Sequence, residues 1–213
     1  MRDVLGRELA QSSTGGPMSD LFAKYAPLLV QSTEADITAD PTLGTKLIID
    51  RTGDLTVSYA PFEHIQRSAR VVIVGITPGA QQASNALVAA RRKLLSGVEH
   101  ASALAAAKVF ASFSGPMRTN LVAMLDHIGV NRWLGVSSTA TLWSADECLV
   151  HFTSALRYPV FLAGKNYSGQ PSMVATPPCG SFSMSVYGRR RRLSAMRCGS
   201  RWVQRRRKVS NGS

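Results

Sequence analysis

The sequence predicts an α/β fold with a short, mainly parallel sheet. An apolar run at residues 70–75 leads directly into a Gly/Pro loop and a long helical region, and strand-like runs at 149–152 and 158–162 follow the helices. Strands that alternate with helices in this way are typical of parallel sheets. The 213 residues, 45% of them apolar, suffice for one domain with a hydrophobic core.

The first third of the chain predicts an arm, a helix and a hairpin. Residues 1–17 are expected to form a flexible N-terminal arm, because they end in the sequence SSTGGP. A helix is predicted from Ser19 or Asp20, either of which can cap it, to Leu29. Two β-rich runs at 46–50 and 55–59 flank a turn, which predicts a hairpin. Residues 62–67 are compatible with a further helix.

The middle of the chain predicts one central strand and three helices. In the predicted strand at 70–75, the residues after Arg70 are apolar at both alternating sets of positions, as a strand buried on both faces must be. Helices are predicted at 82–96, 101–109 and 117–128, and Gly129 is expected to end the last of them. That helix carries one apolar stripe, which should face the core: Leu121, Met124, Leu125 and Ile128.

The composition changes abruptly after Met173. Residues 174–213 hold ten of the 25 Lys and Arg residues and no Asp or Glu, so most of the net charge of +12 lies there. The segment is interpreted as a nucleic-acid-binding arm, as a solvated disordered tail, or as the product of a shifted reading frame. We favour the third because the change is so abrupt. The predicted domain therefore spans residues 18–173 and precedes a basic, disordered tail.

Several classes of protein are not expected. No run approaches the roughly 20 apolar residues of a bilayer span, and residues 1–18 lack the apolar core of a secretory signal. Cys148, Cys179 and Cys198 are too few and scattered for a disulfide framework or a paired-cysteine metal site. The four histidines show no metal-ligand spacing. We expect a cytoplasmic protein that needs no metal or cofactor.

The loop at residues 75–79 is the first candidate for a binding site. It follows the carboxyl end of the predicted central strand, where open α/β sheets bind their ligands. Gly75 and Gly79 allow a close approach of the backbone, and the next helix begins with free N–H groups that suit an anion. A tight turn from strand to helix also needs Gly and Pro for its shape, so this pattern alone leaves both interpretations open.

Two motifs resemble the uracil-DNA glycosylase superfamily, and within it the mismatch-specific uracil/thymine glycosylases. The segment VVIVGITPG at 71–79 is similar to the first motif of that group, whose loop is typically GINPG. The segment FSGP at 113–116, followed by Asn120 and a helix, is similar to its FAGP-type stretch. Residues 153–159 resemble the later strand region more loosely. The resemblance covers about residues 71–161.

The resemblance implies a three-layer α/β/α sandwich, incomplete here at the C-terminus, that cuts the N-glycosidic bond of a uracil flipped out of DNA. Thr77 occupies the catalytic, water-orienting position, and Phe113 matches the aromatic residue that stacks on the base. The remaining positions are implied to bind substrate: Gly75, Ile76, Pro78, Gly79, Gln81, Gln82, Gly115 and Pro116.

The sequence departs from that family in two ways. Thr77 stands where the family has Asp or Asn, and a hydroxyl has neither their charge nor a useful base pKa. The second, HPSG-like loop is absent from the sequence. The expected function is therefore a DNA-binding, uracil-DNA-glycosylase-like repair hydrolase. The alternatives are a catalytically silent module that binds a nucleotide or nucleic acid, and a truncated product without function.

Overall fold

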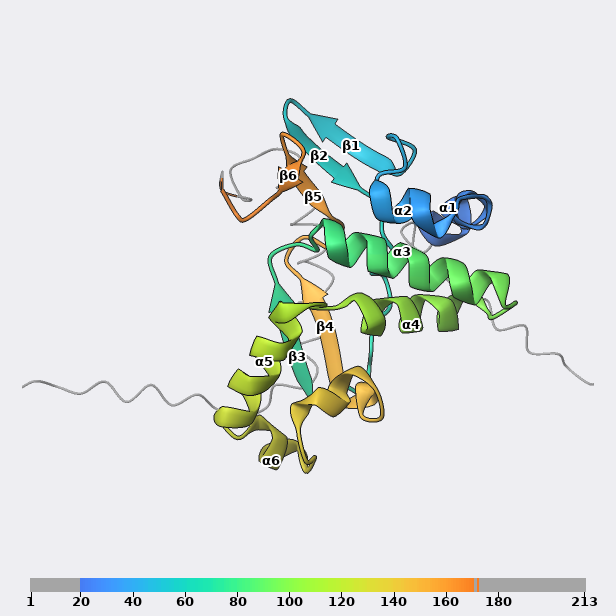
Figure 1. The fold of residues 1–213 in the computed structure, drawn as a ribbon. Helices are drawn as coiled ribbons and strands as arrows, with labels where there is room; N and C mark the ends of the chain where they lie inside the picture. The colour runs from blue at the N-terminus through green and yellow to red at the C-terminus, as the bar shows by residue number, and fades with distance from the viewer. Residues whose placement is uncertain (1–19, 171, 173–213) are drawn as a thin grey trace, which may run out of the picture.

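The computed structural model describes residues 20–170 and 172 and shows a mixed α/β protein (Figure 1). The predicted arm at 1–17 and the predicted tail at 174–213 lie outside the described residues. The helices are α1 (Asp20–Gln31), α2 (Glu34–Ala39), α3 (Ala80–Leu95), α4 (His100–Ala111), α5 (Pro116–His127) and α6 (Val130–Leu134), with short 3-10 turns at Thr139–Trp143 and Glu147–Leu149. The strands are β1 (Ile48–Thr52), β2 (Leu55–Ser58), β3 (Val71–Gly75), β4 (Val150–Ser154), β5 (Val160–Leu162) and β6 (Lys165–Asn166).

The strands form two separate ladders. The larger sheet has the order β1-β2-β5-β6, and its neighbouring strands are antiparallel. The second ladder is the parallel pair β3–β4, in which Val71 lies opposite Val150 and Gly75 opposite Ser154. The α/β class is confirmed, but within the described residues the strands are mixed antiparallel and parallel rather than mainly parallel.

A helical hairpin forms the centre of the larger core. Helices α3 and α4 pack along each other, and α1 and α2 pack on α3 (Figure 1). Small residues on α3 and α4, among them Ala86, Ala90, Ala103 and Ala107, are fully buried and let the two helices approach closely. Fully buried Leu87 belongs to the same cluster as Val57 of β2 and Val160 of β5, so this core extends from the helices to the larger sheet.

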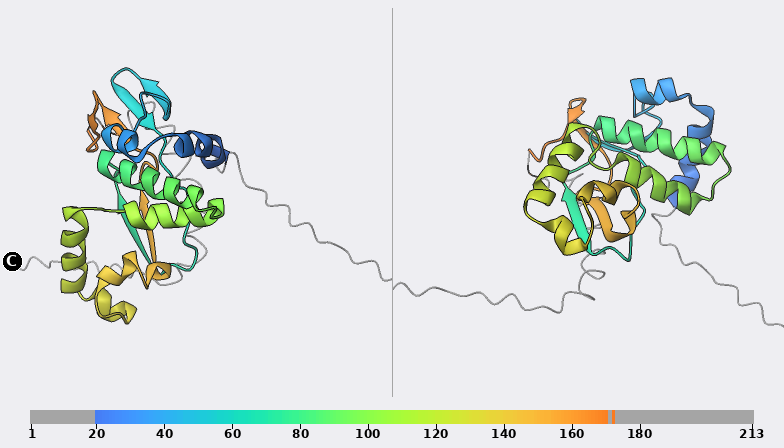
Figure 2. Two further views of the ribbon diagram at one scale, coloured as in Figure 1. Left: turned by 45° about the vertical axis from the view of Figure 1, so that its right-hand side comes forward. Right: turned by 60° about the horizontal axis from the view of Figure 1, so that its bottom comes forward.

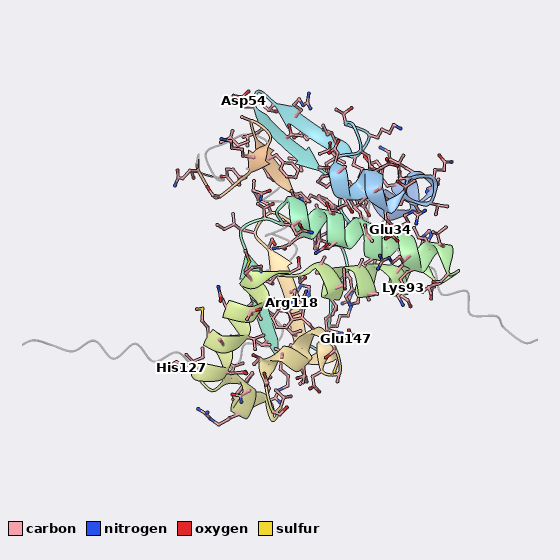
Figure 3. All side chains as sticks on the ribbon, viewed as in Figure 1. Glu34, Asp54, Lys93, Arg118, His127 and Glu147 are labelled. Carbon is pink, nitrogen blue, oxygen red and sulfur yellow. The ribbon has the colours of Figure 1, made fainter. Side chains whose placement is uncertain are left out.

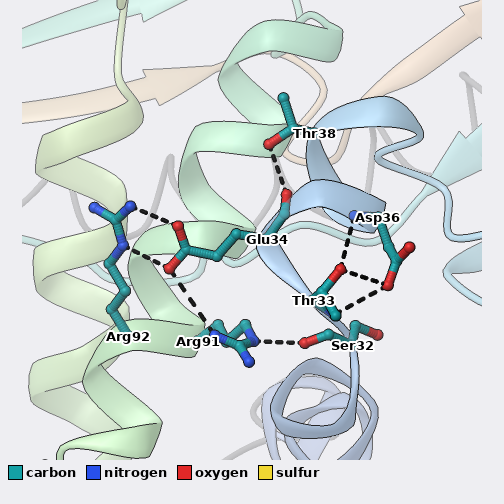
Figure 4. A network of polar contacts seen from close by, with 7 residues as sticks. All are labelled: Ser32, Thr33, Glu34, Asp36, Thr38, Arg91 and Arg92. Atoms are coloured by element: carbon teal, nitrogen blue, oxygen red, sulfur yellow. Dashed lines mark hydrogen bonds and ion pairs between the residues drawn. The ribbon is translucent and has the colours of Figure 1, made fainter.

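Polar contacts fasten α2 to α3. Both nitrogens Nε and Nη2 of Arg92 donate to the Glu34 carboxylate, at 2.8 and 2.6 Å, and Arg91 Nε donates to the Ser32 carbonyl at 2.6 Å (Figure 4). Thr33 caps α2, since its hydroxyl accepts from the backbone N–H of Asp36. Arg91 and Arg92 are thus engaged in holding two helices together.

The region around β3, β4 and α5 is packed more openly. A smaller cluster of Leu134, Leu142, Val150 and Phe152 covers the face of the β3–β4 pair that carries Val71 and Ile73. Helix α5 stands apart from the α3–α4 hairpin (Figure 2) and contains no buried residue. Val74, on the opposite face of β3, is 61% exposed.

The sequence predicted most elements in their observed places. The first helix, the hairpin, the strand at 70–75, the three later helices and both later strands are confirmed with small shifts in their ends. Three expectations are wrong. Residues 62–67 form no helix, and β3 is partly buried on one face and exposed on the other. The stripe of α5 does not face the core, because Met124 and Ile128 are 64% and 70% exposed.

Candidate functional site

A hollow lies beside the carboxyl ends of β3 and β4. It is lined by an aromatic wall, two cations and several hydroxyl groups: Phe62, Pro78, Gln82, Lys108, Ser112, Phe113, Phe152, Thr153, Ser154 and Arg157. Its free volume is about 10 Å³, roughly the room that one water molecule needs, within an open depression of about 280 Å³. The hollow therefore holds a small group at its bottom and leaves space for a larger one at its mouth.

Phe113 forms one wall of the hollow with a strained backbone. Its φ angle is 53°, in the left-handed region that bulky residues rarely adopt. Its ring lies 5.9 Å from the ring of Phe152, centre to centre, and against Gly75, where a Cβ atom would lie 3.6 Å from the ring. Backbone strain of this kind persists only where the surroundings impose it, and it is often found at functional sites.

Arg118 and Trp143 hold the loop that presents Phe113. Arg118 Nη2 donates to the carbonyls of Phe110 and Ser112, at 2.6 and 3.0 Å, and its guanidinium lies over the Trp143 ring. Trp143 Nε1 also donates to the Ser112 carbonyl, at 2.8 Å. Figure 3 labels Arg118 at the junction of α4 and α5. Burial lowers the pKa of Arg118. The conformation of the Phe113 loop is therefore fixed from outside the hollow.

The structure brings together some of the residues that the sequence singled out. Pro78, Gln82 and Phe113 line the hollow, and Gly75 supports the Phe113 ring. The others do not line it. Gln81 is exposed and bonded to Asn85, and Gly79 lies against the Asn166 side chain, which accepts from the backbone N–H of Ala80.

Three further predicted residues lie on other surfaces. The Ile76 side chain is partly exposed near Gly169. Gly115 caps α5 with a φ of 79°, and Pro116 occupies the first turn of that helix, where its missing N–H costs nothing. Gly115 and Pro116 therefore determine how the chain enters α5, directly after the loop that carries Phe113.

Thr77 connects the two ladders. Its hydroxyl donates to the Tyr158 carbonyl at 2.9 Å and accepts from the backbone N–H of Val160 at 3.2 Å. Thr77 does not line the hollow. These two bonds join the loop after β3 to the start of β5. The role of Thr77 in orienting a water stays a prediction.

Sequence reasoning missed the cations and the hydroxyl at the bottom of the hollow. Lys108 is only 4% exposed, and its ammonium group donates to the His64 carbonyl. Thr153 is 8% exposed, and its Oγ1 has no hydrogen-bond partner among the described residues. The one signal in the sequence was a single lysine in the Ala-rich run AAAKVFA, which a count of apolar positions does not distinguish from a surface residue.

A buried carboxyl lies behind this wall. The Tyr158 hydroxyl donates to Glu63 Oε1 at 3.0 Å, and Glu63 Oε2 is buried without a described hydrogen-bond partner. Burial raises the pKa of Glu63 to about 7, although the nearby Arg157 guanidinium favours the charged form. Burial also raises the pKa of Tyr59 and Tyr158. Glu63 therefore changes charge near neutral pH.

Two searches of the described residues, 20–170 and 172, gave negative results. No cluster of three or more His, Cys, Asp or Glu side chains in this part has the arrangement of a metal site. None of its helices combines the length and the apolar character that a membrane crossing requires.

Comparison with known proteins shows one similarity without a described activity. The chain is 35% identical over 169 residues to YoxB of Bacillus subtilis (strain 168), an uncharacterized protein. The match covers 78% of this chain and 64% of YoxB, so the chain spans less than two thirds of that relative's length. No family model and no solved structure matches the chain.

Proposed function

We propose that this chain is a uracil-DNA-glycosylase-like protein of DNA repair. In this proposal a base flipped out of DNA enters the depression at the carboxyl ends of β3 and β4, and the Phe113 ring stacks on it. Hydrolysis of the N-glycosidic bond would add the oxygen of water to the sugar and release the base with a proton. The observation that carries the proposal is Phe113, whose backbone lies in the left-handed region and whose ring lies against Gly75 of the GITPG loop.

Three features support a binding role for this place. It lies at the carboxyl end of a parallel strand pair, where α/β proteins bind ligands. Phe113 is held in a fixed position by Arg118 and Trp143 through the Ser112 carbonyl. The hollow is open to solvent at its mouth, so the polar and aromatic side chains that line it are within reach of a ligand.

The proposal includes a three-layer α/β/α sandwich that is incomplete at the C-terminus. Parallel strands are normally covered on both faces. The described residues leave Val72 and Val74 of β3 exposed, at 55% and 61%. A sandwich of the implied kind would place a further layer over these side chains.

A silent binding module is the second candidate, and the Thr77 hydroxyl favours it. That hydroxyl is engaged by Tyr158 and Val160 and lies outside the hollow. A threonine in this arrangement fixes the loop rather than a nucleophilic water. Such a protein would recognise a flipped base without cutting its bond.

The experiment uses the full chain and a labelled duplex with one uracil opposite guanine. A duplex with cytosine at that position serves as the control. Binding is followed by fluorescence anisotropy, and excision by alkaline cleavage of the abasic strand. A preference for uracil with cleavage supports the hydrolase, and a preference without cleavage supports the silent module.

The variant Thr77→Asn refines the choice, with Thr77→Ser as a control that keeps the hydroxyl. Excision that appears or rises only in Thr77→Asn identifies a pocket that has lost its catalytic group. Equal binding of the uracil and cytosine duplexes by the wild-type chain would show that the proposal is wrong.

A further inference from the structure

We propose that the bottom of the hollow binds an oxyanion, one oxygen of a phosphate or carboxylate group, with Arg157 and Lys108 as the binding cations. The inference goes beyond base recognition and requires no DNA. It rests on the unpartnered polar atoms, the charge and the size of the hollow.

Two buried polar groups of the hollow lack partners. Arg157 Nε and Thr153 Oγ1 are inaccessible to solvent and make no hydrogen bond within the described residues. Both residues line the hollow. A buried donor without an acceptor costs about 1–3 kcal/mol, so such groups mark the place of a bound water or ligand. An oxygen atom placed between them would accept from both.

The charge of the wall favours an anion over a neutral acceptor. Lys108 and Arg157 both line the hollow, and no Asp or Glu is among the lining residues. The ion pairs among the described residues join Glu34 to Arg91 and Arg92. Arg157 therefore has no carboxylate within 4.0 Å in this part of the chain, although the Glu63 carboxyl acts on it from a greater distance. Withdrawing positive charge from water is costly unless an opposite charge accompanies it. Lys108 is buried, and the Nε of the half-buried Arg157 is inaccessible to solvent. A neutral base carbonyl would not compensate that cost.

The segment at residues 62–64 interacts with both cations. The carbonyl of His64 accepts from Lys108, and the carboxyl of Glu63, the preceding residue, interacts electrostatically with Arg157. Phe62, one residue earlier, lines the hollow itself. Three consecutive residues therefore contribute one aromatic side chain to the lining of the hollow and contact or influence the two cations that also line it. The free volume of about 10 Å³ fits one oxygen, and the open depression leaves room for the rest of the group.

The experiment measures anion binding by the full chain with isothermal titration calorimetry at constant ionic strength. Inorganic phosphate and sodium acetate distinguish the two oxyanions. Thymidine monophosphate and thymidine, compared with phosphate, show whether the anion is used free or as part of a nucleotide. The tested variants are Arg157→Gln and Arg157→Lys, and the matched control is Arg132→Gln, which removes an exposed arginine outside the hollow.

We expect one of the two oxyanions to bind, and Arg157→Gln to weaken that binding by about tenfold or more, as for a lost charge-assisted hydrogen bond. Arg157→Lys keeps the charge but not the Nε donor, and should weaken binding by a smaller factor. Arg132→Gln should leave the affinity unchanged. Thermal melts show whether each variant is folded. If Arg157→Gln does not fold, the affinity of Arg157→Lys is the measurement that tests the role of Arg157.

Two results would overturn the proposal. One is no binding of either oxyanion by the wild-type chain. The other is equal binding by the wild-type chain, a folded Arg157 variant and Arg132→Gln, which means adventitious binding to surface cations. Neither result depends on DNA, so the two proposals are tested separately. Anion binding without base recognition would contradict only the proposed function, and base recognition without anion binding would contradict only this inference.

Discussion

The α3–α4 half of the molecule and the β3–β4–α5 half differ in how well their apolar residues are covered. The first half has a large cluster that unites α1, α2, α3 and α4 with β2 and β5, and its side chains include Leu29, Ile37 and Leu87 at 0% exposure. The second half has a cluster of four buried residues, a helix without buried residues and a strand with one bare face.

The hollow lies where these two halves meet. The well-packed half supplies Phe62 and Lys108, which are buried. The open half supplies Phe113, on a loop that polar contacts rather than apolar burial hold in place. The hollow is therefore lined by buried side chains on one side and by the Phe113 loop, with its left-handed backbone, on the other.

The largest expected difference between the halves is in the cost of a truncation. Leu87→Ala removes a fully buried side chain from the large cluster and should lower the free energy of unfolding by about 2–5 kcal/mol. Met124→Ala, on α5, should change it by less than about 0.5 kcal/mol. Urea unfolding of both variants tests this. Equal losses would mean that α5 is covered in solution.

Glu63 should make the well-packed side sensitive to pH. Its pKa of about 7 lies above its ordinary value of 4.5, so the folded state retains a proton that the unfolded chain releases. Stability from this group is therefore full below about pH 4.5 and falls as the pH rises to about 7, by roughly 3 kcal/mol at most. The groups around Glu63 are Tyr59, Tyr158 and Arg157.

The variant Glu63→Gln should flatten that dependence, because it cannot ionise. Thermal or urea unfolding of both proteins between pH 4.5 and pH 8 gives the comparison, and Glu34→Gln, at an exposed ion pair on α2, is the matched control. The same fall in stability for wild type and Glu63→Gln would show that another group is responsible.

The smallest expected effect on stability is at the bare face of β3. Val74→Thr should change the free energy of unfolding by less than about 0.5 kcal/mol and should reduce self-association, since an exposed apolar strand favours pairing between chains. Ile73→Thr, on the covered face of the same strand, should cost more. Light scattering and unfolding curves measure both. A larger loss in Val74→Thr than in Ile73→Thr would reverse the assignment of the two faces.

The sequence predicted the positions of the helices and strands well, but it predicted poorly which of their faces are buried by other elements. Local patterns determine where a strand such as 70–75 begins and ends, and the Gly and Pro residues around it mark its turns. Burial depends on which other elements exist to cover a face, and the apolar character of Val72, Val74 and Met124 does not report that. The expectation of a buried β3 was therefore reasonable for a parallel strand and wrong for this pair.

The sequence predicted those residues of the candidate site that belong to short local motifs, and it missed those that only the tertiary fold brings together. Pro78, Gln82 and Phe113 belong to short motifs that can be recognised in the sequence, and they line the hollow. Thr153, in β4, and Arg157, just after it, lie more than 40 residues along the chain from Lys108 on α4, and no local spacing joins the lysine to them. Only the tertiary fold brings these three side chains to one hollow.

The central claim is that Phe113 serves as a stacking platform rather than as a core residue. The most direct test measures, for Phe113→Ala and wild type, the preference for a uracil duplex over a cytosine duplex, together with the thermal stability of each protein. A lost stacking contact should reduce the preference by about 1–3 kcal/mol, with a smaller change in stability. An unchanged preference with a stability loss of about 3–5 kcal/mol, the cost of an emptied core position, would contradict the account.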